Sequence, residues 1–233
     1  MRHRSRAVLL SLLLPAIAAC AHGDRPKAYP ADFDTAGAQA SLVAVDLLAT
    51  DYLPKFAECE RPDTICMDPA PTWLRLRTVE TVHGAAPPAV FHASTTSHYG
   101  RMDALGKPEA PMLMVVLGDG TDRVMPRYAR AGLFADGAGA LHLVVQQTRP
   151  LFWLPCDVAT LRQPITDPVL RQAAAWKRAD YEQFMATNAA DLYDIVGEQA
   201  LPKYSIPLSR LRDHLAGRTL AAGDFTCDGD AGG

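Results

Sequence analysis

The sequence predicts a mainly β fold with α structure at its C-terminal end: a small antiparallel β-barrel or sandwich followed by a helical segment, stapled by disulfides. Three observations predict it. From residue 41 to about residue 160, short apolar stretches are separated by turn signals. Beyond residue 160, apolar side chains recur every three or four residues, which is typical of an amphipathic helix. Four of the five cysteines lie within this body and can pair fully.

Six or seven short strands are expected in the first part. The clearest is 73–79, where large apolar residues alternate with charged ones, so that one face is expected to be buried and the other exposed to solvent. A hairpin turn is expected at 135–139, which reads Ala-Asp-Gly-Ala-Gly. The other expected strands are 42–48, 89–95, 112–117, 129–134, 141–145 and 151–154. Short strands closed by turns favour a barrel or sandwich.

Two helices are expected in the C-terminal part. Asp167 followed by Pro168 is a helix start signal, a capping residue before a proline at the first helical position. From there we expect an amphipathic helix to Gly197, with a break near Asn188, and a second short helix at 207–215. The apolar stripe predicts a face packed on the barrel, and the alternative is a partner-binding face.

Several features of the middle region share their order with a known family. They are the strand 42–48, the pattern Leu76-x-x-Val79-x-x-Val82-x-Gly84, the strand 112–117, the Asp136-Gly137 hairpin and the late Cys156. Over about 115 residues this order resembles the netrin-like, OB-type barrel of tissue inhibitors of metalloproteinases and their bacterial relatives. The resemblance implies an OB-like barrel.

Protease inhibition does not carry over from that resemblance. Inhibitors of the family insert a disulfide-bonded N-terminal cysteine into the protease site. Here the first cysteine, Cys20, lies more than twenty residues before the first expected strand.

The first nineteen residues have the three zones of a secretory signal peptide. Three arginines open them, an apolar run covers 8–17, and Ala18 and Ala19 follow. This run is shorter than the roughly 20 apolar residues of a spanning helix. Ile17-Ala18-Ala19-Cys20 resembles the lipobox of bacterial lipoproteins, which implies cleavage before Cys20 and a lipid on its thiol. The alternative is an ordinary secreted protein cut after Ala18 or Ala19.

The number of cysteines favours a lipid on Cys20 over an unmodified Cys20. Five cysteines are an odd number, and lipidating Cys20 leaves Cys59, Cys66, Cys156 and Cys227 to pair. We expect the bridges Cys59–Cys66 and Cys156–Cys227, as structural staples of an oxidising compartment rather than as metal ligands or redox groups.

These features divide the chain into four segments: a signal peptide at 1–19, a flexible tether at 20–40, a β-barrel domain at 41–160, and a C-terminal helical segment at 161–233 packed on the barrel. In the lipoproteins that the lipobox resembles, an aspartate directly after the lipidated cysteine retains the protein at the inner membrane. This position is Ala21 here, so the resemblance implies the outer membrane, with the body facing the periplasm. We therefore expect the protein to bind the membrane through its lipid anchor.

Composition limits the function classes. Removing the signal peptide and its three arginines takes the formal net charge from -3 to about -6. An acidic body argues against a nucleic-acid partner, because such binding relies on basic patches. Apolar residues make up 48% and charged residues 21%, as in a folded globular protein.

The sequence assembles no recognisable metal or cofactor site. His83, His92 and His98 lie near one another, but zinc sites usually have tighter spacing and carboxylate support. His92 is expected to be a solvated strand residue opposite Phe91. The oxygen-rich stretch 118–122 lacks the rest of a calcium loop, so a turn is expected there. No glycine-rich phosphate loop is present. We therefore expect no metal and no cofactor.

No catalytic residues are assigned either, because Ser94 and Ser97 lack the Gly-x-Ser-x-Gly frame of a nucleophile. Trp73 and the segment 152–155 are expected to fill the core, and the alternative is an aromatic ligand face. The predicted function is a non-enzymatic binding module for an envelope protein or a small ligand. The alternative is a periplasm-facing hydrolase with scattered catalytic residues, such as His92, His98 and Ser94.

Overall fold

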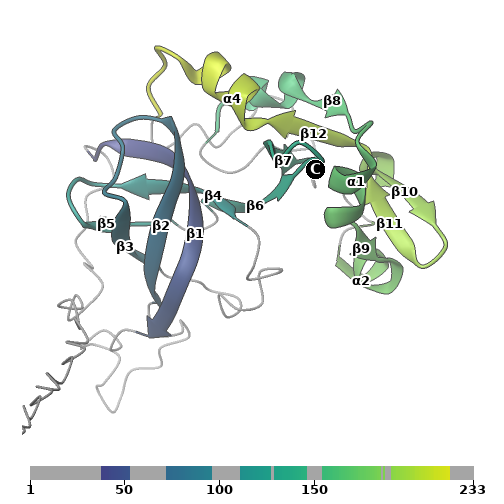
Figure 1. Cartoon of the computed structure of the whole chain (residues 1–233), viewed down its shortest axis with the longest axis horizontal. Helices are drawn as coiled ribbons and strands as arrows, with labels where there is room; N and C mark the ends of the chain where they lie inside the picture. Colours follow the sequence, from purple (N-terminus) through teal and green to yellow (C-terminus); the bar gives the residue numbers. More distant parts are fainter. Residues whose placement is uncertain are drawn as a thin grey trace, which may run out of the picture.

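The computed structural model describes residues 38–52, 72–95, 111–126, 129–145, 154–184, 186 and 190–220. Its first five strands form a closed barrel, seen on the left of Figure 1. They are β1 (Ala40–Tyr52), β2 (Thr72–His83), β3 (Val90–Thr95), β4 (Met112–Leu117) and β5 (Asp122–Val124). The strand order is β1-β2-β3-β5-β4, and β1 also pairs with β4, which closes the ring.

This order confirms the mainly β fold and the OB-like barrel. An OB barrel has five strands in a Greek-key arrangement. The expected strands 42–48, 73–79, 89–95 and 112–117 all lie in this barrel, with longer bounds for the first two. The structure adds the three-residue strand β5 and makes the β3–β5 pair parallel, whereas only antiparallel pairs were expected. A strand this short carries no detectable period of two in the sequence.

The alternation in β2 shows how the barrel is packed. Leu74 and Leu76 are fully buried, while Arg75 and Arg77 on the opposite face are exposed. β1 and β4 instead read as continuous apolar runs, because residues on both of their faces are buried.

A glycine directly after β2 allows the turn between β2 and β3 to form. Gly84 has φ +79°, and a Cβ at this position would lie 2.6 Å from the carbonyl oxygen of Ala40. Only glycine combines this backbone conformation with so close an approach. The glycine in the family-like pattern therefore has a physical reason in this chain.

The sheet continues beyond the barrel through β4. β6 (Arg130–Ala135) pairs with β4, and the order then runs through β7 (Leu141–Val144), β12 (Tyr204–Pro207) and β8 (Gln163–Pro164). The β6–β7 hairpin lies at the expected place, with its turn around Asp136 and Gly137. Of the expected strand 151–154, only Leu154 is described, and it lies in a bend and is buried.

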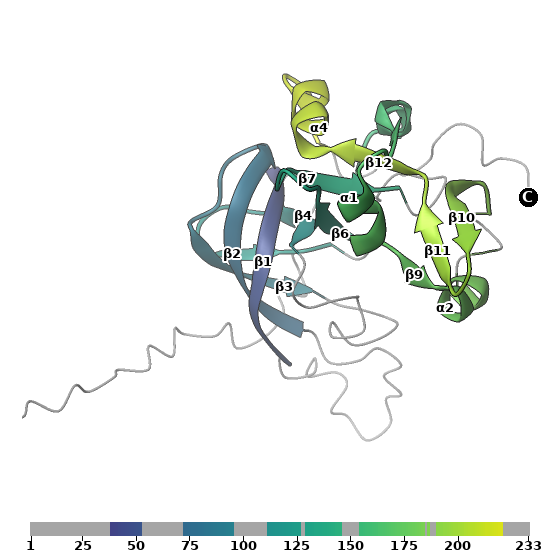
Figure 2. The ribbon, with the colours of Figure 1, turned by 45° about the vertical axis from the view of Figure 1, so that its right-hand side comes forward.

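The C-terminal part is more varied than a helical segment. It contains η3 (Cys156–Leu161), α1 (Pro168–Ala173), β9 (Trp176–Lys177), α2 (Arg178–Phe184), η4 (Ala190–Leu192), β10 (Tyr193–Val196), β11 (Gln199–Pro202) and α4 (Leu208–Leu215). β10, β11 and β9 form a second small sheet, on the right in Figure 2. α4 lies over β7 and β12 and also contacts β2.

The single long helix expected from Pro168 to Gly197 is wrong. Its start is correct, because the Asp167 side chain accepts the backbone N–H of Leu170 and Pro168 opens α1. The helix ends at Ala173, and the apolar residues further on serve a separate small core instead. Gly197, with φ +57°, turns the chain between β10 and β11 rather than ending a helix. The short helix expected at 207–215 is confirmed as α4.

The cysteine predictions remain open. Cys156 opens η3 and is disulfide-bonded, and the other four cysteines lie outside the described residues. The two expected bridges, the lipid on Cys20 and the signal peptide therefore stay predictions. None of the helices among the described residues has the length and apolar character needed to cross a membrane.

Candidate functional site

The outer face of β1, β2 and β3 is the first candidate site. Of the large apolar side chains, Leu48 on β1 is 44% exposed, Val79 on β2 45% and Val90 on β3 40%. Arg77 lies directly opposite Val90 in the β2–β3 register, so Val79 and Val90 are diagonal neighbours on this face. Apolar side chains thus gather on three neighbouring strands, on the side that faces away from the barrel interior.

Two arginines lie among these apolar side chains. Arg75 and Arg77 point outward from β2, and Arg77 forms an ion pair of 2.6 Å with Asp46 on β1. No ion pair of Arg75 is found within the part of the chain that the structure describes. We refer to Leu48, Arg75, Arg77, Val79 and Val90 as the outer face.

An aromatic pair borders the outer face. The Trp73 and His92 rings lie 4.8 Å apart between centroids, and His92 Nδ1 is 3.3 Å from a carboxylate oxygen of Asp122 on β5. Trp73 is only 6% exposed, although it lies on the same side of β2 as Arg75 and not on the side of the core residue Leu74, and the His92 side chain is 20% exposed. His92 is therefore less solvated than expected, because one side of its ring is covered by the indole.

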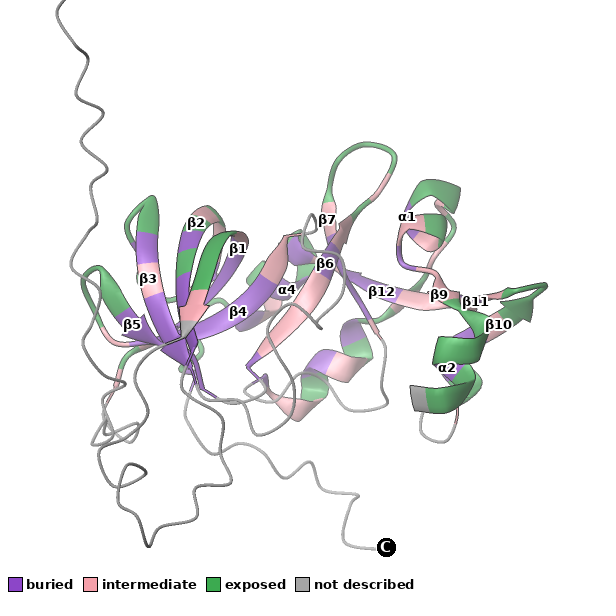
Figure 3. Ribbon diagram, turned by 90° about the horizontal axis from the view of Figure 1, so that it is seen from below, coloured by how far each residue is buried: buried purple, intermediate pink, exposed green. Residues whose placement is uncertain are grey.

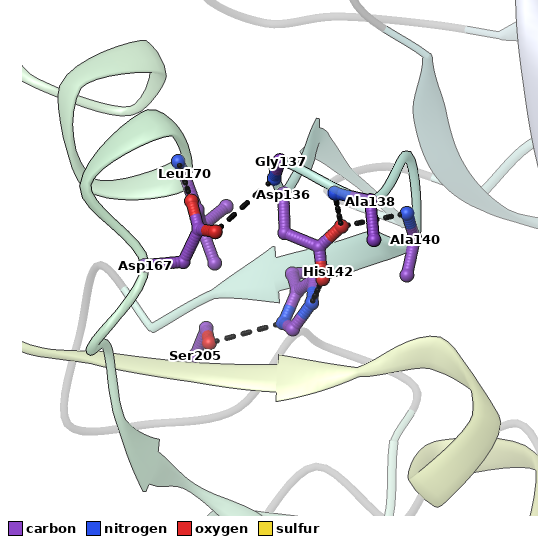
Figure 4. A network of polar contacts seen from close by, with 8 residues as sticks. All are labelled: Asp136, Gly137, Ala138, Ala140, His142, Asp167, Leu170 and Ser205. Carbon is purple, nitrogen blue, oxygen red and sulfur yellow. Dashed lines mark hydrogen bonds and ion pairs between the residues drawn. The ribbon is translucent and has the colours of Figure 1, made fainter.

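The second candidate is a buried polar cluster, drawn in Figure 4, which we call the Asp136–His142–Ser205 cluster. His142 Nε2 is 3.2 Å from Asp136 Oδ2, and His142 Nδ1 is 3.2 Å from Ser205 Oγ. Ser205 lies on β12 and His142 on β7, two strands that pair directly. The order of groups is that of a serine hydrolase.

Asp136 is held in place by the hairpin that contains it. Its Oδ1 accepts the backbone N–H of Ala138 at 2.9 Å and of Ala140 at 2.8 Å. The Ala140 N–H, with the His142 side chain and the Ala138 N–H, lowers the pKa of the Asp136 carboxyl. A deprotonated Asp136 therefore accepts the Nε2 proton of His142, which leaves Nδ1 to accept the Ser205 hydroxyl.

Burial decides against hydrolysis at this cluster. Ser205 is 1% exposed and His142 is 7% exposed, and Ser205 lies inside a strand that pairs with β7 and β8 at once. A nucleophile needs a substrate carbonyl within reach, usually from a sharp exposed turn. What the cluster does instead is join the β6–β7 hairpin to β12.

A third cluster joins η3 to the end of α4 and the residues that follow it. Asp157 receives Arg218 at 2.8 Å and His214 Nε2 at 3.2 Å. The Arg218 hydrogen bond, then His214, lowers the pKa of Asp157 to about 2. All three groups are partly exposed, so this is a surface clamp between η3 and the end of α4.

Of the residues singled out for a hydrolase, the structure describes His92 and Ser94, both on β3. Ser94 is 4% exposed, and His98 and Ser97 lie outside the described residues, as do Phe152 and Trp153. The stretch 118–120 is a turn, and Asp122 pairs with His92 instead of facing an ion. In the part of the chain that is described, no three His, Cys, Asp or Glu side chains are grouped as metal ligands would be.

The sequence contained a signal for part of the buried cluster. Asp136 begins the predicted hairpin turn and His142 follows it by six residues, so the hairpin itself places the two side chains close together. Ser205 could not be added, because β12 was not expected.

Comparisons with known proteins add no family. The chain matches no protein-family model, and no curated protein or solved structure is significantly similar to it.

Proposed function

We propose that the protein is a lipid-anchored protein of the bacterial cell envelope whose barrel is a non-enzymatic binding module for another envelope protein. The observation that supports this is the group of exposed apolar side chains on the outer face, Leu48, Val79 and Val90. Exposed apolar side chains that lie on neighbouring strands often mark an interaction site. In OB-type barrels, the outer surface of the second and third strands is a common binding surface.

The shape and chemistry of the outer face favour a protein over a small ligand. Small-molecule sites are usually concave, whereas this face is the outside of a sheet. Arginine and apolar side chains together are typical of protein interfaces, where a guanidinium can pair with a carboxylate or a backbone carbonyl. Arg75 is the available cation, because Arg77 already pairs with Asp46.

The alternative, a periplasm-facing hydrolase, has weaker support. The only described arrangement of serine, histidine and aspartate in contact is the Asp136–His142–Ser205 cluster, and its serine is buried. We therefore propose binding rather than catalysis.

Site-specific photo-crosslinking in intact cells tests the proposal. A photoreactive phenylalanine analogue would replace Val79 on the outer face, with Val169 on α1 as the matched control, since these valines are 45% and 55% exposed. We expect a discrete protein adduct at position 79 and none at position 169. Adding Arg75→Glu should weaken the adduct at 79, because it reverses the charge beside the probe.

Two results would contradict the proposal. One is an identical set of adducts from positions 79 and 169, which would indicate random collision. The other is an activity on ester or amide substrates that disappears in Ser205→Ala while the protein stays folded, which would favour the hydrolase.

A further inference from the structure

Arg130 is the one described arginine whose environment leaves a buried guanidinium nitrogen without a partner. Its Nη1 is buried and donates no hydrogen bond to any described residue. An arginine carries five N–H donors and stays charged at neutral pH. Buried charges in proteins are normally paired, because an unpaired one costs several kcal/mol of solvation.

The side chains around Arg130 explain why its Nη1 has no hydrogen-bond acceptor among the described residues. Arg130 begins β6 opposite Met114 of β4, and Met114 lies opposite Val43 of β1. Residues paired in this way share one face of a sheet. Val43 and Met114 are both fully buried, so the guanidinium stands beside apolar side chains.

Arg123 shows the contrast, because it is a buried residue whereas Arg130 is only partly buried. Arg123 on β5 is 5% exposed, but its Nε donates to the Gly120 carbonyl and its Nη1 lies 3.5 Å from the Ser41 hydroxyl. The charge of Asp119 also raises its pKa, against the lowering by burial. For Arg130, burial alone lowers the pKa to about 10, with no carboxylate opposing it. Arg130 thus remains protonated at neutral pH, and no residue in the described part of the chain supplies a counter-charge.

We propose that Arg130 binds an anionic ligand, through a carboxylate or phosphate group, at the start of β6, where this strand pairs with β4. The planar guanidinium presents a fork of donors that matches these oxyanions and can hold one by two parallel hydrogen bonds. The apolar neighbours Val43 and Met114 would strengthen such a pair by excluding water. This site is separate from the outer face and does not depend on the proposed function.

Thermal unfolding at constant ionic strength tests the site, with chloride, acetate and inorganic phosphate as the probes. We expect the Tm of the unmodified protein to rise saturably in acetate or phosphate relative to chloride, by about 3–6 °C at ten times the Kd. Arg130→Met should remove this response, and in chloride it should have a higher Tm than the unmodified protein, because an unpaired buried charge is gone.

Two further variants separate a specific site from general salt effects. Arg210→Met removes an exposed arginine of α4 and should keep the full response to the oxyanions. Arg130→Lys keeps the charge but loses the fork, so its response should be weaker than that of the unmodified protein. If Arg130→Met does not fold, titrating phosphate while observing the arginine Nε–H signals by NMR should shift one protected signal saturably.

The proposal is overturned by either of two outcomes. In the first, chloride, acetate and phosphate give the same Tm in the unmodified protein. In the second, the rise in Tm is equally large in Arg130→Met and Arg210→Met, which would place the anions elsewhere on the surface.

Discussion

His142 holds together two segments that are far apart in the chain. Its ring bonds Asp136, six residues earlier, and Ser205, sixty-three residues later. Because both the ring and the serine are buried, the hydrogen bond between them is made where water does not compete, while the bond to Asp136 is part-buried. The same three residue types that form a hydrolase site here form a structural link, and exposure of the serine is what separates the two roles.

Replacing His142 with alanine should therefore lower the stability of the protein, and His142 should have no catalytic role. Ser205 would keep a buried hydroxyl with no partner, and we expect a loss of about 1–3 kcal/mol in the free energy of unfolding. Urea unfolding followed by circular dichroism would measure it, with His83→Ala on the half-exposed end of β2 as the control. A fluorophosphonate probe should leave Ser205 unlabelled in the native protein. Labelling of Ser205 would contradict its structural role.

At the scale of elements, Asp157 connects η3 to the end of α4. Its contacts with Arg218 and His214 fix the segment in which the disulfide-bonded Cys156 begins η3. The clamp therefore adds a charge-dependent contact to a region that a covalent bond also restrains.

The Asp157 clamp should make stability depend on pH in acid. The folded pKa of Asp157, about 2, lies below its ordinary value of 3.8. A lowered carboxyl pKa gives a contribution that is complete above about pH 4 and is lost as the pH falls through about 2. Tm values of the unmodified protein and Asp157→Asn, measured from pH 7 to pH 2, should differ most near neutrality and converge near pH 2. A constant difference over this range would show that the carboxylate charge is not the cause.

The turn after β2 gives a second prediction at this scale. Gly84→Ala should cost about 1–3 kcal/mol of stability, because it adds a Cβ that collides with the Ala40 carbonyl as well as an unfavourable φ. Gly139→Ala is the matched control: its φ is +85°, but a Cβ there meets no atom within 4 Å. Chemical unfolding should show the larger loss for Gly84→Ala. Equal losses would mean that the backbone conformation alone matters.

How far the sequence predicts these elements depends on how each is stabilised. Strands such as β2 repeat a buried and an exposed residue, so their pattern alone identifies them. β12 has four residues and is fixed by pairing with β7 and β8, which lie far earlier in the chain, so no local pattern contains it. Ile195 and Val196 fitted a helical spacing, yet they lie in a strand beside the Gly197 turn. The outer face follows from the β2 alternation, whereas Ser205 and the setting of Arg130 required the folded chain.

At the scale of the whole molecule, the barrel shares its core with η3 and α4, and a smaller core lies apart in the C-terminal part. The main core includes residues of the barrel, η3 and α4, and a second one gathers Tyr181, Leu192, Tyr193 and Ala200. Figure 3 shows the contrast: β4 of the barrel is largely buried, while α2 and the end of β10 next to its turn are largely exposed. Val145 packs against both cores. The outer face lies on the barrel, well away from this second core.

The proposed anchor determines how the whole molecule is presented at the membrane. Between Cys20 and the first described residue, Ala38, a fully extended chain spans at most about 60 Å. The barrel would thus stay within that distance of the bilayer, where an outer-face partner in the same membrane is reachable. This bound applies only if Cys20 carries the lipid.

Metabolic labelling with a fatty-acid analogue tests the anchor. The unmodified protein should be labelled and should sediment with membranes, because two or more acyl chains give stable attachment. Cys20→Ala should lose the label and be released, while its barrel stays folded, since position 20 lies before β1. Ala21→Asp is the control, which should keep the label and, if the resemblance to retained lipoproteins holds, move the protein to the inner membrane. An unlabelled mature protein, or membrane association that survives Cys20→Ala, would contradict the lipid anchor on Cys20.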